Sequence, residues 1–121
     1  MFFVVSKQLY IIIVRGGIAD LIPSEIIRDI RKYETYLEKH QIEFVFMPPS
    51  LLAHFQNKSS HLKVVMAAAE RLSGISSSNF KIYNHYGQTE TGGTFFSFFV
   101  DKEYDNTPIG KPDADVEFCI L

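Results

Sequence analysis

Six short apolar runs, separated by polar segments that contain glycine or proline, dominate the pattern of this chain. They cover residues 9–14, 42–47, 62–68, 80–83, 95–100 and 116–121. Each has the length of a strand and is rich in β-branched or aromatic residues, so each is predicted as a strand. Residues 9–14 are apolar throughout, which predicts a strand buried on both faces, as in a parallel sheet.

Helical spacing follows the first run. Pro23-Ser24-Glu25 is typical of a helix start, with Ser24 as the capping residue and Glu25 in the first turn. Apolar residues then recur on one helical stripe, at Ile26, Ile27, Ile30, Tyr33 and Leu37. A helix is therefore predicted over residues 24–37, and a second, short helix capped by Ser50 is predicted to run to Phe55.

Strands that alternate with helices in the first half predict an α/β fold, with a partial, mostly parallel sheet flanked by helices. A chain of 121 residues suffices for a single domain. The polar run at residues 73–79 has the composition of a connection within that domain. The last apolar run stops without a turn or a polar tail, so we expect residues 1–121 to be a single partial domain.

Charge and composition exclude several classes of function. Twelve Lys and Arg against fourteen Asp and Glu give a net charge of -2, without a basic cluster for nucleic acid. The apolar start is interrupted by Ser6-Lys7-Gln8 and is shorter than the ~20 residues of a membrane-spanning helix. Cys119 is the one cysteine, and its apolar neighbours predict a buried residue. A cytoplasmic protein that binds neither nucleic acid nor membrane is expected.

The candidate chemistry lies at residues 84–94, Asn-His-Tyr-Gly-Gln-Thr-Glu-Thr-Gly-Gly-Thr, between two predicted strands. Loops in this position bind ligands in α/β proteins. Tyr86 offers a flat face for a base, Thr89 a hydroxyl for a phosphate, and Glu90 a carboxylate oxygen for Mg²⁺. These groups suit a nucleoside triphosphate; the alternative is a polar surface turn, because short motifs also occur by chance.

This segment resembles the Asn-x-Tyr-Gly-Pro-Thr-Glu motif of adenylate-forming, AMP-binding enzymes, most closely the adenylation domains of nonribosomal peptide synthetases. Pro108-Ile109-Gly110-Lys111-Pro112 follows at the distance that the family uses. Residues 36–42 and 46–52 are similar to the family's helix and to its strand ending in Pro-Pro-Ser, and residues 62–72 occupy the place of its Gly-Gly-Glu strand. The resemblance covers residues 9–121 and is loosest at 15–22.

The resemblance implies the large-subdomain fold of acyl-adenylate synthetases and a two-step reaction. An amino or other carboxylic acid attacks the α-phosphate of ATP and releases pyrophosphate, and the acyl-adenylate then passes to the phosphopantetheine thiol of a carrier protein. Tyr86 would stack on adenine, beside Asn84, while Thr89 and Glu90 would act catalytically on the α-phosphate and on Mg²⁺. The implied nucleotide-binding set is Ala69, Asn84, His85, Tyr86, Gly87 and Thr89.

The family's pocket for the acid corresponds here to Phe46, Met66, Ala68, His85, Gly93 and Thr94. The bulk of Phe46 and Met66 favours a small acid, and His85 is a polar contact for it. Equally, Phe46 and Met66 suit core positions on apolar strands, and His85 suits an ordinary loop histidine.

Two departures from the family pattern open alternatives. Ala67-Ala68-Ala69-Glu70 stands where the family has paired glycines, so the added methyl groups are expected to crowd the approach of the backbone to adenine. Gln88 replaces the commoner proline and is frequent in acyl-CoA synthetases, which form the second hypothesis. The third is a nucleotide-binding or interaction module without catalysis.

Other parts of the family pattern have no counterpart in the sequence. The phosphate loop with its lysine is expected upstream, and the ribose-binding aspartate, the hinge and the C-terminal subdomain are expected downstream. Without them the substrates are not positioned, so we expect no turnover from these 121 residues. His40, His54 and His61 lack metal-ligand spacing, and Ser24 and Ser50 lack a nucleophile elbow, so neither a zinc site nor a serine hydrolase is predicted.

Overall fold

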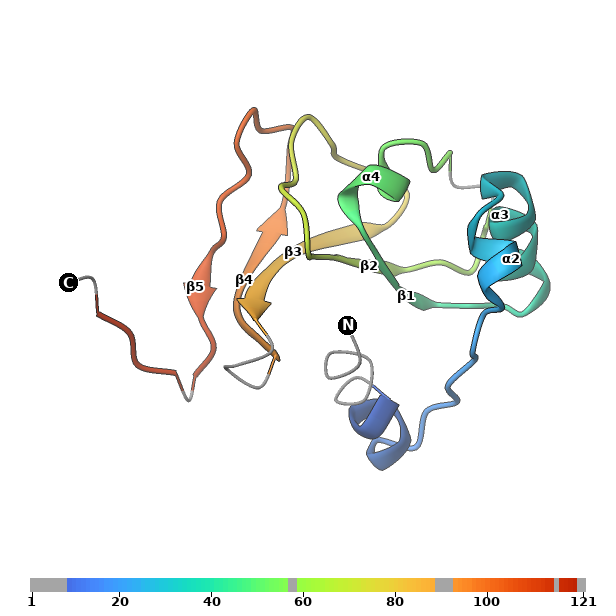
Figure 1. The fold of residues 1–121 in the computed structure, drawn as a ribbon, viewed down its shortest axis with the longest axis horizontal. Coiled ribbons are helices and arrows are strands. Elements are labelled where there is room, and N and C mark those ends of the chain that lie inside the picture. Colours follow the sequence, from blue (N-terminus) through green and yellow to red (C-terminus); the bar gives the residue numbers. More distant parts are fainter. Residues whose placement is uncertain (1–8, 57–58, 89–92, 115, 120–121) are drawn as a thin grey trace.

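The computed structural model describes residues 9–56, 59–88, 93–114 and 116–119, which form a five-stranded sheet with helices at one end (Figure 1). The strands are β1 (Phe44–Met47), β2 (Val64–Ala67), β3 (Lys81–Gln88), β4 (Gly93–Val100) and β5 (Lys111–Pro112), in the order β1-β2-β3-β4-β5. β1, β2 and β3 are parallel, whereas β4 and β5 join antiparallel. The predicted α/β class is confirmed, with a mixed sheet.

One face of the sheet forms the core. The strand register places Val45, Val65, Ile82 and Val100 in one row across β1 to β4. All four are buried, and Tyr33 and Leu37 belong to the same apolar cluster. Because side chains alternate along a strand, the intervening residues face the other side. Phe44 and Phe99, 39% and 46% exposed, show that this second face is less covered.

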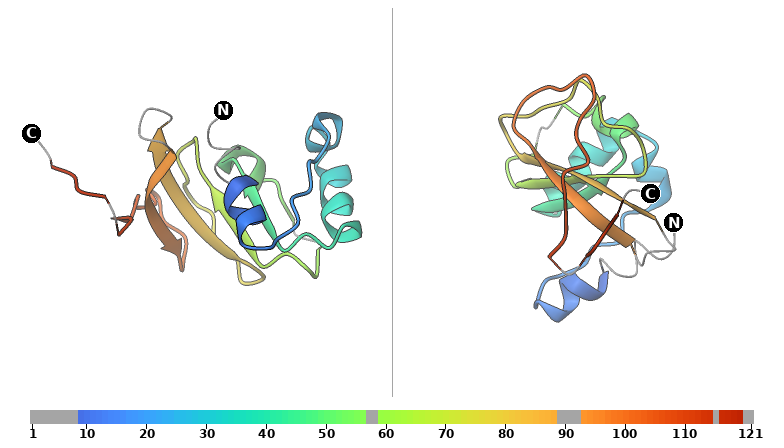
Figure 2. Two further views of the ribbon diagram at one scale, coloured as in Figure 1. Left: turned by 90° about the horizontal axis from the view of Figure 1, so that it is seen from below. Right: turned by 90° about the vertical axis from the view of Figure 1, so that its left-hand side faces the viewer.

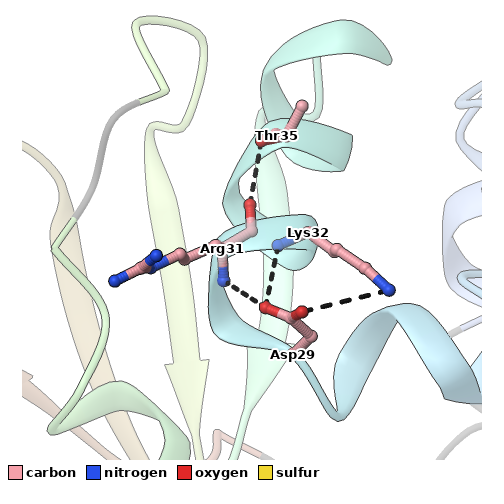
Figure 3. Close-up of polar contacts among 4 residues, drawn as sticks. All are labelled: Asp29, Arg31, Lys32 and Thr35. Carbon is pink, nitrogen blue, oxygen red and sulfur yellow. Dashed lines mark hydrogen bonds and ion pairs between the residues drawn. The ribbon is translucent and has the colours of Figure 1, made fainter.

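The predicted helix over residues 24–37 is two helices, α2 (Ser24–Ile27) and α3 (Ile30–Lys39). Asp29 begins α3, because its carboxylate accepts hydrogen bonds from the backbone N–H groups of Arg31 and Lys32 at 3.1 and 3.3 Å (Figure 3). Ser24 makes no capping hydrogen bond. The predicted cap was therefore wrong, because Asp29 satisfies the free N–H groups of the longer helix.

The short helix α4 (Pro49–Leu52) also begins differently from the prediction. Pro48 precedes its first turn, and the helix ends before Phe55. Ser50 instead donates from its backbone N–H and its hydroxyl to the carboxylate of Glu70, at 2.9 and 3.1 Å. The residue predicted as a cap thus ties α4 to the segment that follows β2.

Residues 9–14 are helical, so the buried strand predicted there was wrong. The N–H groups of Arg15 and Gly17 donate to the carbonyls of Ile11 and Ile12 at 3.1 and 2.8 Å. Tyr10, Ile13 and Val14 are more than 60% exposed, and the helix lies apart from α2 and α3 (Figures 1 and 2). A short apolar run has no periodicity that distinguishes a helix from a strand. A helix also satisfies the hydrogen-bonding groups of its own backbone without a neighbouring strand.

The C-terminal strand predicted at residues 116–121 was also wrong over the described residues 116–119, which are neither helix nor strand. The last strand is β5, where Lys111 and Pro112 pair with Ser97 and Phe96. Cys119 is exposed, in contrast to its predicted burial, because this segment pairs with no strand of the described residues. Within the described ranges, no helix is both long and apolar enough to cross a membrane.

Candidate functional site

A cavity of about 360 Å³ lies where three segments meet beyond the end of β2. The segments are residues 69–72 after β2, residues 84–87 of β3, and residues 106–109 before β5. The lining residues are Ala69, Glu70, Arg71, Leu72, Asn84, His85, Tyr86, Gly87, Asn106, Thr107 and Ile109. Five of the six residues predicted to bind the nucleotide are among them.

Sheet register brings the first two segments together. Ala67, the last residue of β2, pairs with Asn84 in the middle of β3. Because the two strands are parallel and β3 continues for four more residues, the chain that leaves β2 lies beside the end of β3. Carboxyl ends of parallel strands are where α/β sheets bind ligands.

Hydrogen bonds join residues 71–74 to residues 104–107 in a wall, of which Arg71, Leu72, Asn106 and Thr107 line the cavity. The Ser73 hydroxyl donates to the Asp105 carbonyl at 2.6 Å, and the Gly74 N–H donates to the Tyr104 carbonyl at 2.8 Å. The Thr107 N–H completes the wall by donating to the carbonyl of Leu72 at 3.3 Å. Segments thirty or more residues apart in the chain are therefore joined side by side.

Asn84 fixes β3 to the third segment. Its side chain is 6% exposed, and its Nδ2 donates to the carbonyl of Pro108 at 2.9 Å. Gly110, two residues further, has a φ of +92°, and a Cβ there would overlap the backbone carbonyl of Ser97. The Pro-Ile-Gly segment thus requires both glycine and this asparagine to approach the sheet so closely.

Tyr86 presents an aromatic face at the cavity. Its ring makes edge contacts with Phe95 and Phe96, with centroids 5.8 and 6.4 Å apart, and the residue is nevertheless 52% exposed. The pairing of β3 with β4 shifts register between Tyr86 and Gly87. Such a bulge redirects side chains at the end of a strand. The ring is held by its neighbours and still offers a surface for stacking.

Ala69 has a φ of +75°, in the left-handed region that favours glycine. The sequence resemblance places a glycine near this position, and the backbone here has a conformation that suits glycine, although the residue is alanine. Ala69 lines the cavity, where the sequence predicts that its methyl group crowds adenine.

His85 carries a buried Nδ1 atom without a hydrogen-bond partner among the described residues. Burial lowers the pKa of His85 from its ordinary value of 6.5, although the charge of Asp113 acts in the opposite direction. The imidazole is therefore neutral at pH 7.

Three of the six residues predicted for the acid pocket lie on the less covered face of the sheet. Phe46 and Met66 are paired neighbours on β1 and β2, and Met66 pairs with Tyr83, two residues before His85. Alternation along β3 puts His85 on the face of Phe46 and Met66, both of them half-buried. Ala68 is buried just after β2, while the backbones of Gly93 and Thr94 pair with Gln88 and Gly87.

Thr89 and Glu90, predicted to contact the α-phosphate and Mg²⁺, lie outside the described residues, and both roles remain predictions. Elsewhere, no three His, Cys, Asp or Glu side chains gather to hold a metal ion within the part of the chain that the structure describes. A second cavity, of about 260 Å³, is lined by Leu52, Phe55, Gln56 and residues 75–80, and contains none of the predicted site residues.

Sequence reasoning missed part of the main cavity, namely Arg71, Asn106, Thr107 and Ile109. The side-chain oxygen of Thr107 is buried without a hydrogen-bond partner in the described ranges. Thr107 and Ile109 flank the first residue of the Pro-Ile-Gly motif, and Arg71 follows the Glu70 of the alanine-rich segment. Their nearness to recognised motifs was the available signal.

Comparison with known proteins identifies the family. The model of the AMP-binding enzyme family matches residues 1–121. Bacitracin synthase 1 of Bacillus licheniformis is 30% identical over 115 residues, which cover 94% of this chain and 2% of that protein. The chain thus spans a very small share of the length of this relative.

Solved structures share the fold. The N-terminal subdomain of Klebsiella oxytoca NpsA in complex with anthranilyl-AMSN has a TM-score of 0.62 at 16% identity, over 87% of this chain and 30% of that one. NpsA-ThdA, an artificially fused Adenylation-PCP di-domain NRPS from Klebsiella oxytoca, has a TM-score of 0.58 at 16% identity, over 79% and 20%. The predicted resemblance to adenylation domains is confirmed, and the chain belongs to the family of AMP-binding enzymes.

Proposed function

We propose that this chain supplies the adenine-binding wall of an adenylate-forming enzyme that activates an amino acid for nonribosomal peptide synthesis. The observation that carries the proposal is that Ala69, Asn84, His85, Tyr86 and Gly87 line one cavity. All five are predicted nucleotide-binding residues. Ala69 follows β2 and the other four lie on β3, so the pairing of these two strands brings them together.

Within this proposal, the groups at the cavity divide the recognition of adenine between them. The exposed face of Tyr86 stacks on the base, which every purine or pyrimidine permits. Asn84 uses one amide N–H on Pro108, and the rest of its amide is available for the polar edge of adenine. The backbone at Ala69 borders the same space from the β2 side.

Thr89 and Glu90 follow Gln88, the last residue of β3, in the sequence, and we assign them to the phosphates of the nucleotide whose base lies against Tyr86. The Glu90 carboxylate is a hard oxygen ligand of the kind that Mg²⁺ prefers. The bound ion would supply charge stabilisation at the α-phosphate. The Thr89 hydroxyl would hold the α-phosphate in place.

The proposed reaction has two steps. A carboxylate oxygen of the acid bonds to the α-phosphorus of ATP as the bond from that phosphorus to pyrophosphate breaks. The thiol of phosphopantetheine on a carrier protein then attacks the acyl carbon and AMP leaves. Similarity to bacitracin synthase 1 and to the fused Adenylation-PCP protein supports an amino acid substrate and a carrier-protein partner. The bulk of Phe46 and Met66 supports a small acid.

A second candidate is an acyl-CoA synthetase, in which coenzyme A replaces the carrier protein. Gln88 favours it, because glutamine at this place in the motif is frequent in those enzymes. The two candidates share the adenylation step and differ in the thiol acceptor. Transfer to coenzyme A by a longer protein that contains this chain would select the second.

Calorimetric titration of the 121-residue chain with AMP tests the proposal. Tyr86→Ala is expected to weaken AMP binding by the ~1–3 kcal/mol of a base stacking contact. Tyr10→Ala is the matched control, because Tyr10 is an exposed tyrosine on the helix at residues 9–14. Equal affinities of the Tyr86→Ala variant and the wild type would contradict the stacking role.

A further inference from the structure

Among the described residues that line the main cavity, Arg71 is the one lysine or arginine. It follows Glu70 in the connection after β2, and its side chain is exposed. Within the described ranges, no carboxylate lies at ion-pair distance from its guanidinium. A positive charge without an acidic partner thus borders the space proposed for the nucleotide.

The guanidinium also has a hydrogen-bond acceptor within reach. Arg71 Nη2 donates to the carbonyl of Asp105 at 3.4 Å, and the same carbonyl accepts the Ser73 hydroxyl at 2.6 Å. The Asp105 carbonyl thus links Arg71 to Ser73 and orients the guanidinium through one hydrogen bond. A planar group oriented in this way loses less conformational entropy on contact with a ligand than a free side chain does.

The part of the ligand that Arg71 contacts can be inferred from the residues that line the cavity with it. Arg71 lines the same cavity as Tyr86, and we assign the ring of Tyr86 to the base. The portion of the ligand that shares this cavity with Arg71 is therefore the base. Guanidinium groups stack on flat π-systems, and arginine contributes in this way to the binding of nucleic-acid bases.

We propose that Arg71 stacks its guanidinium plane on the adenine base, so that the base is held by Tyr86 from β3 and by Arg71 from the β2 connection. This inference rests on the proposed nucleotide function of the cavity. It assigns Arg71 to recognition of the base and not to charge pairing with phosphate.

The test compares adenosine and AMP as ligands of the 121-residue chain, by calorimetry at one ionic strength. Arg71→Ala is expected to weaken both ligands by the same factor, about two- to fivefold. Arg71→Lys keeps the charge but lacks the plane, and is expected to weaken both to a similar extent. Arg31→Ala, at an exposed arginine on α3, is the control and is expected to leave both affinities unchanged.

Three results would overturn the inference in distinguishable ways. Loss of AMP affinity alone, with adenosine unchanged, would show a phosphate contact. Unchanged binding of both ligands in Arg71→Ala would show that Arg71 takes no part. Failure of the wild type to bind either ligand, with an intact thermal unfolding transition, would remove the proposed function itself.

Discussion

At the scale of single residues, Gly110 and Gly74 share a positive φ but differ in their surroundings. A Cβ at Gly110 would overlap the backbone of Ser97, whereas nothing lies within 4 Å of a Cβ at Gly74. Gly110→Ala is therefore expected to lower the free energy of unfolding by about 2–5 kcal/mol, and Gly74→Ala by about 1–2 kcal/mol. Urea unfolding measures both, and equal losses would contradict the close approach at Gly110.

His85 gives the chain a pH dependence of known sign. Because burial lowers its pKa in the folded state, the unfolded chain binds a proton at this residue more readily. Its contribution to stability is complete above the ordinary value of 6.5 and is lost as the pH falls from there through the lower folded pKa. We expect His85→Asn to flatten the loss of stability on acidification below pH 6.5, measured by thermal unfolding; an unchanged slope would show that another group titrates.

Motif residues of the site could be predicted from the sequence, because Asn84, Tyr86 and Gly87 are consecutive or nearly so. Arg71 and Thr107 were missed, since their place at the cavity depends on hydrogen bonds to Asp105 and Leu72, each more than thirty positions away in the sequence. The left-handed backbone conformation of Ala69 could not be predicted either, because alanine rarely adopts it. The predicted roles of Thr89 and Glu90 remain untested.

At the scale of elements, Asp29 and Ser24 provide a matched pair. Asp29 caps α3 through two backbone N–H groups, whereas Ser24 makes no capping hydrogen bond at α2. Asp29→Ala is expected to destabilise the chain by about 0.5–2 kcal/mol, and Ser24→Ala by much less. Circular dichroism during urea unfolding checks this, and a larger effect at Ser24 would reverse the assignment of the helix start.

Strands were predictable where neighbours in the sheet exist. Residues 44–47, 64–67 and 81–88 form β1, β2 and β3 within or overlapping the predicted apolar runs, because neighbouring strands pair with β2 and β3 on both sides and with β1 on one side. Residues 9–14 have a similar composition, but their backbone bonds locally as a helix. The composition of a segment indicates its preference for a strand, but the segment forms a strand only where a neighbouring strand is available to pair with it.

At the scale of the whole molecule, the sequence contains no Ser/Thr/Gly-rich phosphate loop with a lysine. The 121 residues alone are therefore predicted to catalyse no exchange of pyrophosphate into ATP, with any amino acid, because the outer phosphates lack a binding group. Radioactive pyrophosphate exchange measures this. Acid-dependent exchange above the buffer background would mean that these residues position ATP by themselves.

The most direct test of the nucleotide site is an AMP titration of the ¹⁵N-labelled chain, followed by its backbone amide resonances. We predict weak binding, with a dissociation constant on the order of 1 mM. The shifted resonances are expected at residues 69–72, 84–87 and 106–109, while those lining the second cavity at residues 75–80 stay in place. Shifts confined to the second cavity, or none at millimolar AMP, would contradict an adenine site at the end of β2.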